Sequence, residues 1–432
     1  MKTRTRSPRA LLLVATLFVL SLIAAPAVVA QGLDWGGTID GSGSATFADH
    51  LDDPDTDFSA SVALWLATLF EPSETAAIEV TLQPSYTWAD DRPYLVDLDR
   101  AVADMRFGAI AGPGSVLRGR AGRFPLSDAS GLIISDTVDG ADFTLSVAGI
   151  RVRVAGAYTG LLLNPVSNFR MSAADEADAG DDDLFFGPAR ILATSEIAFP
   201  EIVGRETLTL AYIGQFDLRD PEEGEDTINS HYVGLRADGP IIPGLFHQVS
   251  TFFSFADEEL DDESDDDLGI LGSLRVTYFR PDWLSSSFGL RGVVITGISE
   301  EDDNFHTISD QQASTVATIP GENVAYGEFT YGLKPLAGAQ SRVFRDIQTT
   351  LGSRVLFRIM PEQPVDSFGA SVTSEGQYIG TEATFTLGWR ILSDLGTSLT
   401  GGIFLPGTGS SGVFTDQRET EYLVRMQASA SF

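Results

Sequence analysis

The chain has 432 residues, of which 61 are acidic and 28 basic, and its formal net charge at pH 7 is −33. So negative a field excludes nucleic-acid binding through overall charge, because phosphate groups would be repelled. The chain contains no cysteine, which excludes disulfides and a cysteine-linked lipid anchor.

Residues 1–30 have the pattern of a secretory signal peptide. Four basic residues and no acid precede an apolar run from Ala10 to Ala25, and small residues follow at Ala27 and Ala30. We expect cleavage after Ala30, or alternatively after Ala27. A membrane-anchoring helix is the alternative, but the apolar run is shorter than the ~20 residues that span a bilayer. Removing residues 1–30 would change the net charge from −33 to −37, because four basic residues are lost.

From residue 37 onward, amphipathic segments of about ten residues alternate with short turns and long polar loops, as in transmembrane barrels. We therefore predict an all-β protein in which residues 31–432 form a single transmembrane antiparallel β-barrel. About 18 strands are expected, within a range of about 16 to 20, with short periplasmic turns and long acidic extracellular loops. The predicted strands are 37–47, 58–69, 76–87, 94–108, 116–124, 139–148, 150–159, 190–200, 207–217, 229–238, 245–255, 268–279, 286–297, 323–333, 343–359, 377–390, 396–405 and 422–432.

The side-chain alternation within a segment indicates a wall between apolar and aqueous surroundings. In 377–390, Ile379, Phe385 and Trp389 share one face, and Glu382 and Arg390 share the other. A soluble β-sandwich would alternate as well, but the signal peptide, the terminal aromatic residue and the even spacing of so many segments favour the barrel.

Segment 94–108 fits this alternation least well, because its charged residues fall on both faces. These residues are Asp97, Asp99, Arg100, Asp104 and Arg106. A β-bulge or a misplaced strand boundary is predicted there.

The last strand also alternates, and Tyr422, Val424, Met426 and Phe432 share its apolar face. A strand that ends on an aromatic residue resembles the C-terminal assembly signal of bacterial outer-membrane β-barrel proteins. The resemblance implies the barrel-assembly machinery as a partner and the bacterial outer membrane as the location.

Arginine supplies nearly all of the positive charge, since only Lys2 and Lys334 are lysines. Charge on the lipid face at mid-bilayer costs ~2–4 kcal/mol for arginine, so the strand arginines are expected to face the lumen. The predicted pore-lining residues are Arg118, Arg120, Arg151, Arg153, Arg236, Arg275, Arg291, Arg354, Arg358, Arg390 and Arg425. They would favour anions, or they would pair with lumen acids and brace the wall; both roles are compatible.

A barrel of this size leaves an aqueous channel unless something fills it. The candidates for narrowing the pore are loop 160–189 and loop 125–138, which contains the apolar run Gly131–Ile134. Alternatively, this apolar run packs on the outer rim of the barrel.

Acidic runs dominate five of the long segments, 49–57, 175–183, 220–226, 257–267 and 300–303, which hold 29 of the 61 acids. Solvated, mutually repelling surface loops are the expected state. The run 261–267 could bind divalent cations that bridge lipid phosphates, but it lacks the spacing and central glycine of a calcium loop. We expect no metal site, no cofactor and no enzymatic activity, because the four histidines stand in no catalytic motif.

Three segments, Leu117–Phe124, Gly131–Ile134 and Asp139–Phe143, resemble a pattern of porins and alginate-export-type channels. In these families a strand with Gly-Arg leads into a loop, and Asp-Gly opens the return strand. The resemblance implies an outer-membrane channel with 18 strands and an arginine-rich lumen.

Three functions follow from this reading. The first is an outer-membrane channel for passive diffusion of small solutes, in which an arginine-lined lumen would favour anions. The second is an exporter of an anionic polysaccharide, and the third is a closed structural or adhesive barrel acting through acidic surface loops. The expected surroundings are outer-membrane lipid and a lipopolysaccharide-type surface. Both a monomer and a trimer are compatible with the sequence.

Overall fold

The computed structural model describes residues 32–48, 54–90, 94–172, 175, 185–219, 228–260, 263–297, 305–360, 376–415 and 418–432. The expected signal peptide, residues 1–30, lies outside the described residues, as do parts of all five acidic segments. For residues 256–260 and 263–267 only the backbone is described. None of the helices in these ranges is long and apolar enough to span a membrane.

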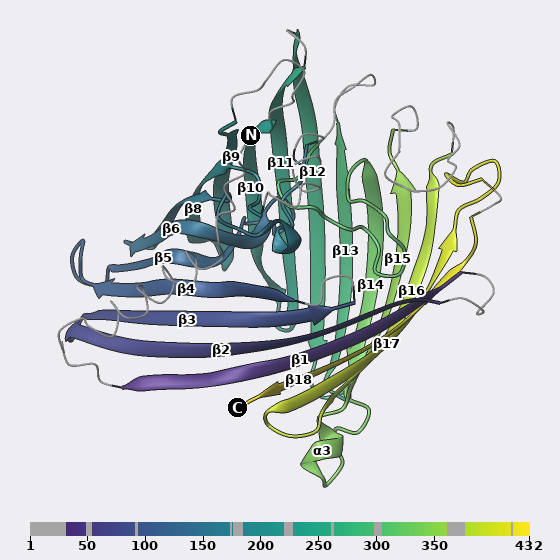
Figure 1. Ribbon diagram of the computed structural model, residues 1–432, viewed down its shortest axis with the longest axis horizontal. Helices are drawn as coiled ribbons and strands as arrows, with labels where there is room; N and C mark the ends of the chain where they lie inside the picture. The colour runs from purple at the N-terminus through teal and green to yellow at the C-terminus, as the bar shows by residue number, and fades with distance from the viewer. Residues whose placement is uncertain are drawn as a thin grey trace, which may run out of the picture.

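Eighteen strands form one closed antiparallel sheet, in which each strand pairs with its neighbours in the sequence (Figure 1). The strands are β1 (Leu33–Phe47), β2 (Asp55–Ser73), β3 (Ala76–Ala89), β4 (Leu95–Gly108), β5 (Val116–Ser127), β6 (Ser135–Val147), β7 (Ile150–Tyr158), β8 (Arg190–Val203), β9 (Glu206–Asp217), β10 (Ile228–Ile242), β11 (Leu245–Leu260), β12 (Glu263–Arg280), β13 (Ser286–Gly297), β14 (Val324–Leu333), β15 (Gln348–Arg358), β16 (Tyr378–Arg390), β17 (Leu395–Pro406) and β18 (Glu421–Ser431). The described residues also form two named short helices, η1 (Asn164–Val166) and α3 (Arg342–Arg345). The predicted strand number and the predicted antiparallel barrel are confirmed.

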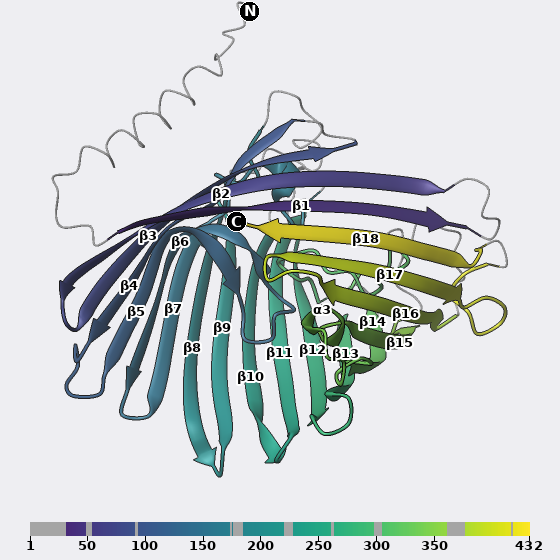
Figure 2. The ribbon, with the colours of Figure 1, turned by 90° about the horizontal axis from the view of Figure 1, so that it is seen from below.

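The barrel closes where the first and last strands meet, as β1 pairs with both β2 and β18 (Figure 2). The closure continues to the last residue, because the backbone N–H of Gly37 donates to the carbonyl of Phe432 at 3.1 Å, and Phe432 N–H donates to Gly37 at 3.0 Å. A closed sheet leaves no unpaired edge, which is the condition for strands to cross a lipid bilayer.

Most strand boundaries agree with the predicted ones, and two differences have clear causes. The predicted strand 343–359 begins at Gln348 instead, because residues 334–347 form a turn containing α3. At the other end of the barrel, β11 and β12 pair as far as Leu260 and Glu263, where a loop over 256–267 was expected. Extending the hairpin pairs backbone groups that a loop would leave to water.

A bulge explains the charges of β4, as the sequence indicated. The register between β3 and β4 shifts so that Gln83 opposes Arg100 and Pro84 opposes Leu98, which leaves Asp99 as the extra residue. The bulge shifts the side-chain alternation of β4 by one residue. Val96 and Leu98 are exposed on the outer face, and the charged residues of the strand lie on the inner face. The structure therefore keeps every charge of this strand off the outer wall.

A second bulge corrects the face assigned to Ile379. The register between β15 and β16 shifts at this point, since Leu356 opposes Gly380 and Phe357 opposes Tyr378. Ile379 is completely buried within an apolar cluster, whereas Phe385 on the same strand is exposed. Ile379 was expected to share the face of Phe385, and that expectation was wrong because the bulge moves one residue out of phase.

Candidate functional site: an arginine-lined lumen narrowed by loops

The loop that follows β5 turns into the lumen. Ile133 and Ile134 are fully buried in an apolar cluster with inward residues of the wall, among them Leu192 and Phe252. Arg236 on β10 donates to the carbonyl of Ala129 at 2.6 Å, so the loop reaches inside the barrel from β5 to β10. Of the two candidate loops, 125–138 thus folds inward, and the alternative that its apolar run packs on the outer rim is wrong.

Two further segments join this loop inside the barrel. The N–H groups of Ile308 and Ser309 donate to Ile133 at 2.9 and 3.0 Å. In turn, Arg170 N–H donates to Ile308 at 2.9 Å, and Asp310 N–H donates to the carbonyl of Asn168 at 2.7 Å. Residues 160–172, the described first part of the other predicted loop, therefore contribute, whereas the inward course of residues 305–322 was not expected from the sequence.

The second apolar cluster lies where residues 313–319 meet the strands that close the barrel. Val316, Ala317 and Ile319 pack with inward residues such as Phe404 and Leu423. The backbone of this segment is tied to the wall, because Thr315 N–H and Val316 N–H donate to the carboxylate of Glu382 at 2.7 and 3.1 Å. The lumen is consequently narrowed by packed apolar side chains on two sides.

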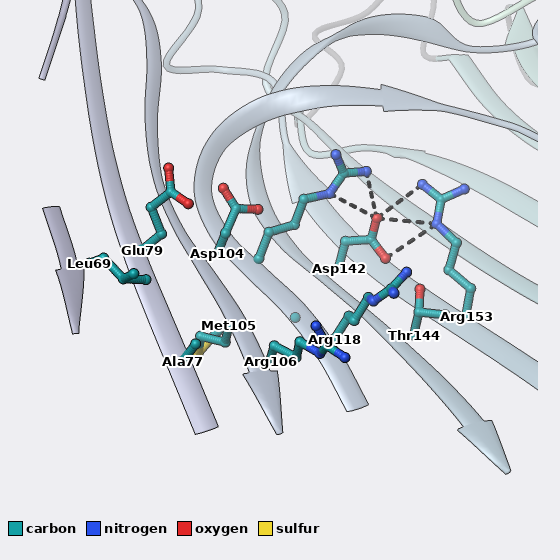
Figure 3. Close-up of a pocket in the computed structure, with 12 residues that line it drawn as sticks. Leu69, Ala77, Glu79, Asp104, Met105, Arg106, Arg118, Asp142, Thr144 and Arg153 are labelled. Atoms are coloured by element: carbon teal, nitrogen blue, oxygen red, sulfur yellow. Dashed lines mark hydrogen bonds and ion pairs between the residues drawn. The ribbon is translucent and has the colours of Figure 1, made fainter. Parts of the chain in front are cut away.

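Asp142 on β6 holds two of the predicted pore-lining arginines. Arg120 donates to Asp142 Oδ2 through Nε and Nη2 at 3.1 and 2.7 Å, and Arg153 donates to Asp142 Oδ1 through Nε at 3.2 Å (Figure 3). Arg153 also contacts Glu196 on β8 at 3.1 Å. The Asp142 side chain is only 6% exposed, so this part of the wall is braced by ion pairs, as one reading of the sequence proposed.

Three neighbouring arginines, Arg106, Arg118 and Arg151, have no such carboxylate partner among the described residues. Arg106 on β4 lies directly opposite Arg118 on β5 in the strand register, and the two line a cavity of about 490 Å³ (Figure 3). A second cavity, of about 730 Å³, is lined by Arg118, Arg151, Arg153 and Arg236 together with Ala129 of the inward loop. Like charges placed directly opposite each other on adjacent strands are unfavourable, so Arg106 and Arg118 place uncompensated positive charge beside a cavity that Glu79 and Asp104 also line.

A further row of charged residues crosses the opposite part of the wall. In the register, Arg275 faces Arg291, Arg291 faces Glu328, and Glu328 faces Arg354. Arg354 pairs with Glu328 at 3.3 Å and also donates to the carbonyl of Ala313 in the inward loop. Both Arg291 and Arg354 lie against the ring of Tyr326, at 5.7 and 5.0 Å from its centroid.

The remaining predicted pore-lining arginines take other positions. Arg358 is buried and donates to the carbonyl of Gly376 at 2.6 Å. Arg390 donates to Ser393 in the turn that follows β16, at 2.7 Å. Arg425 opposes Ser44 and Thr400, on the face opposite Val424 and Met426, which are exposed on the outer wall together with Phe432. Tyr422, the fourth residue of the predicted assembly signal, opposes Phe47 of β1.

The wall near the barrel closure has a different chemistry. A cavity of about 520 Å³ is lined there by small polar and glycine residues of β1, β2, β3, β17 and β18. The lining side chains include Ser42, Ser59, Thr397 and Gln427, with Asp40 as the one charged residue. Short hydroxyl side chains project less far into the lumen than the arginines of β4 to β7 do, so this part of the lumen is wider.

The sequence pattern missed Arg106 and Tyr326 as lumen residues. Arg106 was hidden by the bulge in β4, a local irregularity of the backbone that residue spacing does not reveal. Tyr326 was missed although it lies between two of the predicted arginines, Arg291 and Arg354.

We expect the loop contacts to resist mild acid, because Glu322 keeps its charge well below neutral pH. Burial raises the pKa of Glu322, but hydrogen bonding from His306 and the charge of Arg170 lower it further, to below its ordinary value of 4.5. Because the pKa of Glu322 is lower in the folded than in the unfolded protein, the Arg170–Glu322 pair stabilises the loops fully above pH 4.5. This stabilisation is lost as the pH falls through the folded-state pKa of Glu322. The conductance step that depends on Glu322 should therefore lie below pH 4.5. Glu322→Gln should abolish that step, and a step above pH 4.5 that disappears in Glu322→Gln would contradict the assignment.

Several solved structures share this fold at low sequence identity. Pseudomonas aeruginosa OccK11 (OpdR) has a TM-score of 0.57 and 11% identity, over 93% of this chain and 96% of that chain. Pseudomonas aeruginosa OccK2 (OpdF), crystallised in complex with glucuronate, also has a TM-score of 0.57 and 11% identity, over 92% and 98%. Acinetobacter baumannii OccAB4 has a TM-score of 0.55 and 10% identity, over 94% and 100%.

Identities this low establish the fold and nothing finer. No protein-family model matches the sequence, and no curated protein matches it significantly. The chain thus has the fold of large outer-membrane channels with 18 strands. The expected resemblance to porin-type outer-membrane barrels is confirmed at this level.

Proposed function

We propose that the protein is an outer-membrane channel for passive diffusion of small solutes and that it favours anions. The observation that carries the proposal is the group of lumen arginines around two cavities, Arg106, Arg118 and Arg151, for which the described part of the chain provides no carboxylate partner. A solute with a negative charge supplies what these guanidinium groups lack, and one arginine can contact both oxygens of a carboxylate. No catalytic step is required, because the selection is made by size and by the electrostatic field.

The narrowing of the lumen supports small solutes over a polymer. Three inward segments and two apolar clusters occupy a barrel that would otherwise be wide. A charged polymer chain would have to pass these packed residues along its whole length. The exporter of an anionic polysaccharide is therefore the weaker of the two transport hypotheses. The third hypothesis, a closed structural barrel, predicts that no ionic current passes through the inserted protein.

A solved structure with the same fold independently supports an anionic solute. One of them, Pseudomonas aeruginosa OccK2 (OpdF), was solved in complex with glucuronate, a sugar acid with a single carboxylate. A solute of this kind also carries hydroxyl groups, which could bind the hydroxyl-lined wall around Ser42 and Ser59 in this chain. Small organic acids are accordingly the first solutes to test.

This function requires export and insertion. Cleavage of a signal peptide, residues 1–30, would deliver the chain across the inner membrane. The face of Val424, Met426 and Phe432 would then serve the barrel-assembly machinery and finally contact outer-membrane lipid, with the long loops at the lipopolysaccharide-type surface. Either a monomer or a trimer would preserve the channel, because each barrel has its own lumen.

The test is the reversal potential of single channels in a planar bilayer under a potassium chloride gradient. A chloride preference is expected for the unaltered protein. One charge at about 4 Å contributes ~1 kcal/mol even in water, so Arg118→Ser with Arg151→Ser should lower the chloride-to-potassium permeability ratio severalfold.

Arg205→Ser is the matched control, because Arg205 lies exposed in the turn between β8 and β9, outside both cavities. Its removal should leave the ratio unchanged. Stable insertion without current would overturn the channel, and current without a chloride preference would overturn the role of the arginines.

A further inference from the structure

One turn at the end of the barrel that carries the short connections is folded against the outside of the wall. Residues 334–347 join β14 to β15, and their helix α3 extends below the ends of these strands (Figure 1). Trp389 of β16 donates its Nε1–H to the carbonyl of Val343 at 2.9 Å, and its ring stacks on that of Phe344 with centroids 6.4 Å apart. Trp389 has the same strand parity as Phe385, which is exposed on the outer face. The turn therefore sits at the outer wall, where lipid head groups would lie.

Aromatic residues crowd the same end of the neighbouring strands. Phe288 stacks on Tyr331 with centroids 4.8 Å apart and on Tyr278 with centroids 6.2 Å apart. Trp283, in the turn between β12 and β13, lies 6.2 Å from both Phe288 and Tyr331. Rings of this kind are enriched where a barrel crosses from hydrocarbon to head groups. They mark the level of the membrane interface beside α3.

Positive charge is concentrated at this interface, although the whole chain has a net charge of −33. The basic residues of the two turns are Arg280, Lys334, Arg342 and Arg345. Only Asp282 and Asp346 oppose them. Arg280 and Arg345 are exposed and have no carboxylate partner among the described residues, while the side chain of Arg342 is 80% exposed despite a 3.8 Å contact with Asp346.

We propose that these two turns form a binding surface for anionic phospholipid in the membrane leaflet at the short-turn end. We name it the turn patch, and its members are Arg280, Trp283, Lys334, Arg342, Phe344 and Arg345. The rings fix the depth of the patch, and the cations contact lipid phosphate from outside the wall. The proposal rests on the outer-membrane location in the proposed function but not on the ion selectivity of the lumen.

The partner chemistry follows from charge and position. A basic surface beside an aromatic belt is complementary to an anionic head group and to the acyl chains below it. Lipopolysaccharide would lie at the opposite, long-loop end of the barrel. Each basic residue near a membrane surface contributes ~1 kcal/mol, which is about fivefold in affinity.

The test measures phosphatidylglycerol retained by the refolded full chain. The protein is inserted into vesicles of phosphatidylcholine and phosphatidylglycerol, extracted gently and analysed by native mass spectrometry. Arg345→Ser should lower the preference for phosphatidylglycerol about fivefold, and the triple variant Arg280→Ser, Arg342→Ser, Arg345→Ser should abolish it. Phe344→Ala should weaken retention of both lipids, since it removes apolar contact without changing charge.

Arg205→Ser again serves as the matched control, because it removes an exposed arginine from a short turn in which Glu201 and Glu206 already balance its charge. Equal retention by the unaltered protein and the triple variant would overturn the proposal, as would an equal loss in Arg205→Ser. Selectivity that survives high salt would also contradict it, because surface charges are screened. Recording current from the same preparations separates the two proposals, since retention of lipid without conductance would overturn only the channel.

Discussion

Replacing residues 313–319 by the dipeptide Asn-Gly is expected to raise the single-channel conductance severalfold. The replacement can close, because Gln312 and Pro320 already face each other as an antiparallel bridge pair, and Asn-Gly is a favoured two-residue turn between paired strands. It removes Val316 and Ile319, which fill the lumen against the closing strands. Conductance increases with the width of the narrowest aqueous section.

The same replacement should leave the preference for chloride nearly unchanged. Arg354 would lose the carbonyl of Ala313 but keep its ion pair with Glu328. The carboxylate of Glu382 would lose the hydrogen bonds from Thr315 and Val316, so a positive and a negative charge become accessible to solutes together. Ser314→Ala is the matched control, because it removes the hydroxyl that bonds Glu382 but leaves the bulk of the segment in place. Unchanged conductance in the Asn-Gly variant, with stable insertion, would show that solutes pass elsewhere in the lumen.

The wall of this barrel could be predicted from the sequence because its physics is local. Each strand separates lipid from a polar interior, so side chains alternate with a period of two residues. That constraint acts on every residue of β18, for example, and Val424 and Met426 are exposed on the outer wall as the pattern indicated. Strand number followed from counting such segments.

The contents of the lumen could not be predicted in the same way. Residues 305–322 have no period, and their burial depends on partners distant in the sequence, such as Ile133, Glu382 and Phe404. The run Gly131–Ile134 was recognisable only because apolar residues in an aqueous loop are costly. Nothing comparable marked Ile308 or Ile319 as lumen residues before the fold was known.

Local irregularities limited the assignment of charged residues. The extra residue at Asp99 reverses the alternation within β4 and so moves Arg106 into the lumen beside Arg118. The eleven arginines expected to line the pore also differ in what surrounds them. Arg118 and Arg151 border cavities, whereas Arg358 and Arg390 are held by backbone carbonyls. Sequence parity gives the face of a side chain but not whether its charge is already neutralised.

Asp142→Asn is expected to destabilise the barrel and at the same time to increase its chloride preference. The carboxylate of Asp142 neutralises Arg120 and shares Arg153 with Glu196. Asparagine has nearly the same shape but no charge, so Arg120 would remain 30% exposed without a counter-ion. Removing one partner of a buried pair costs about 3–5 kcal/mol, and we expect the lower end or less here because Arg120 is partly hydrated.

Urea unfolding from lipid vesicles measures the stability, and the reversal potential measures the selectivity. Adding Arg120→Gln to Asp142→Asn should restore part of the stability, since Arg153 keeps Glu196, and should return the chloride preference toward its original value. If Asp142→Asn altered neither property, water rather than Asp142 would be neutralising these arginines. In that case Arg120 and Arg153 would contribute to the electrostatic field of the lumen as fully as Arg118 and Arg151 do. Pairing with a carboxylate would then not distinguish the arginines that attract anions from those that do not.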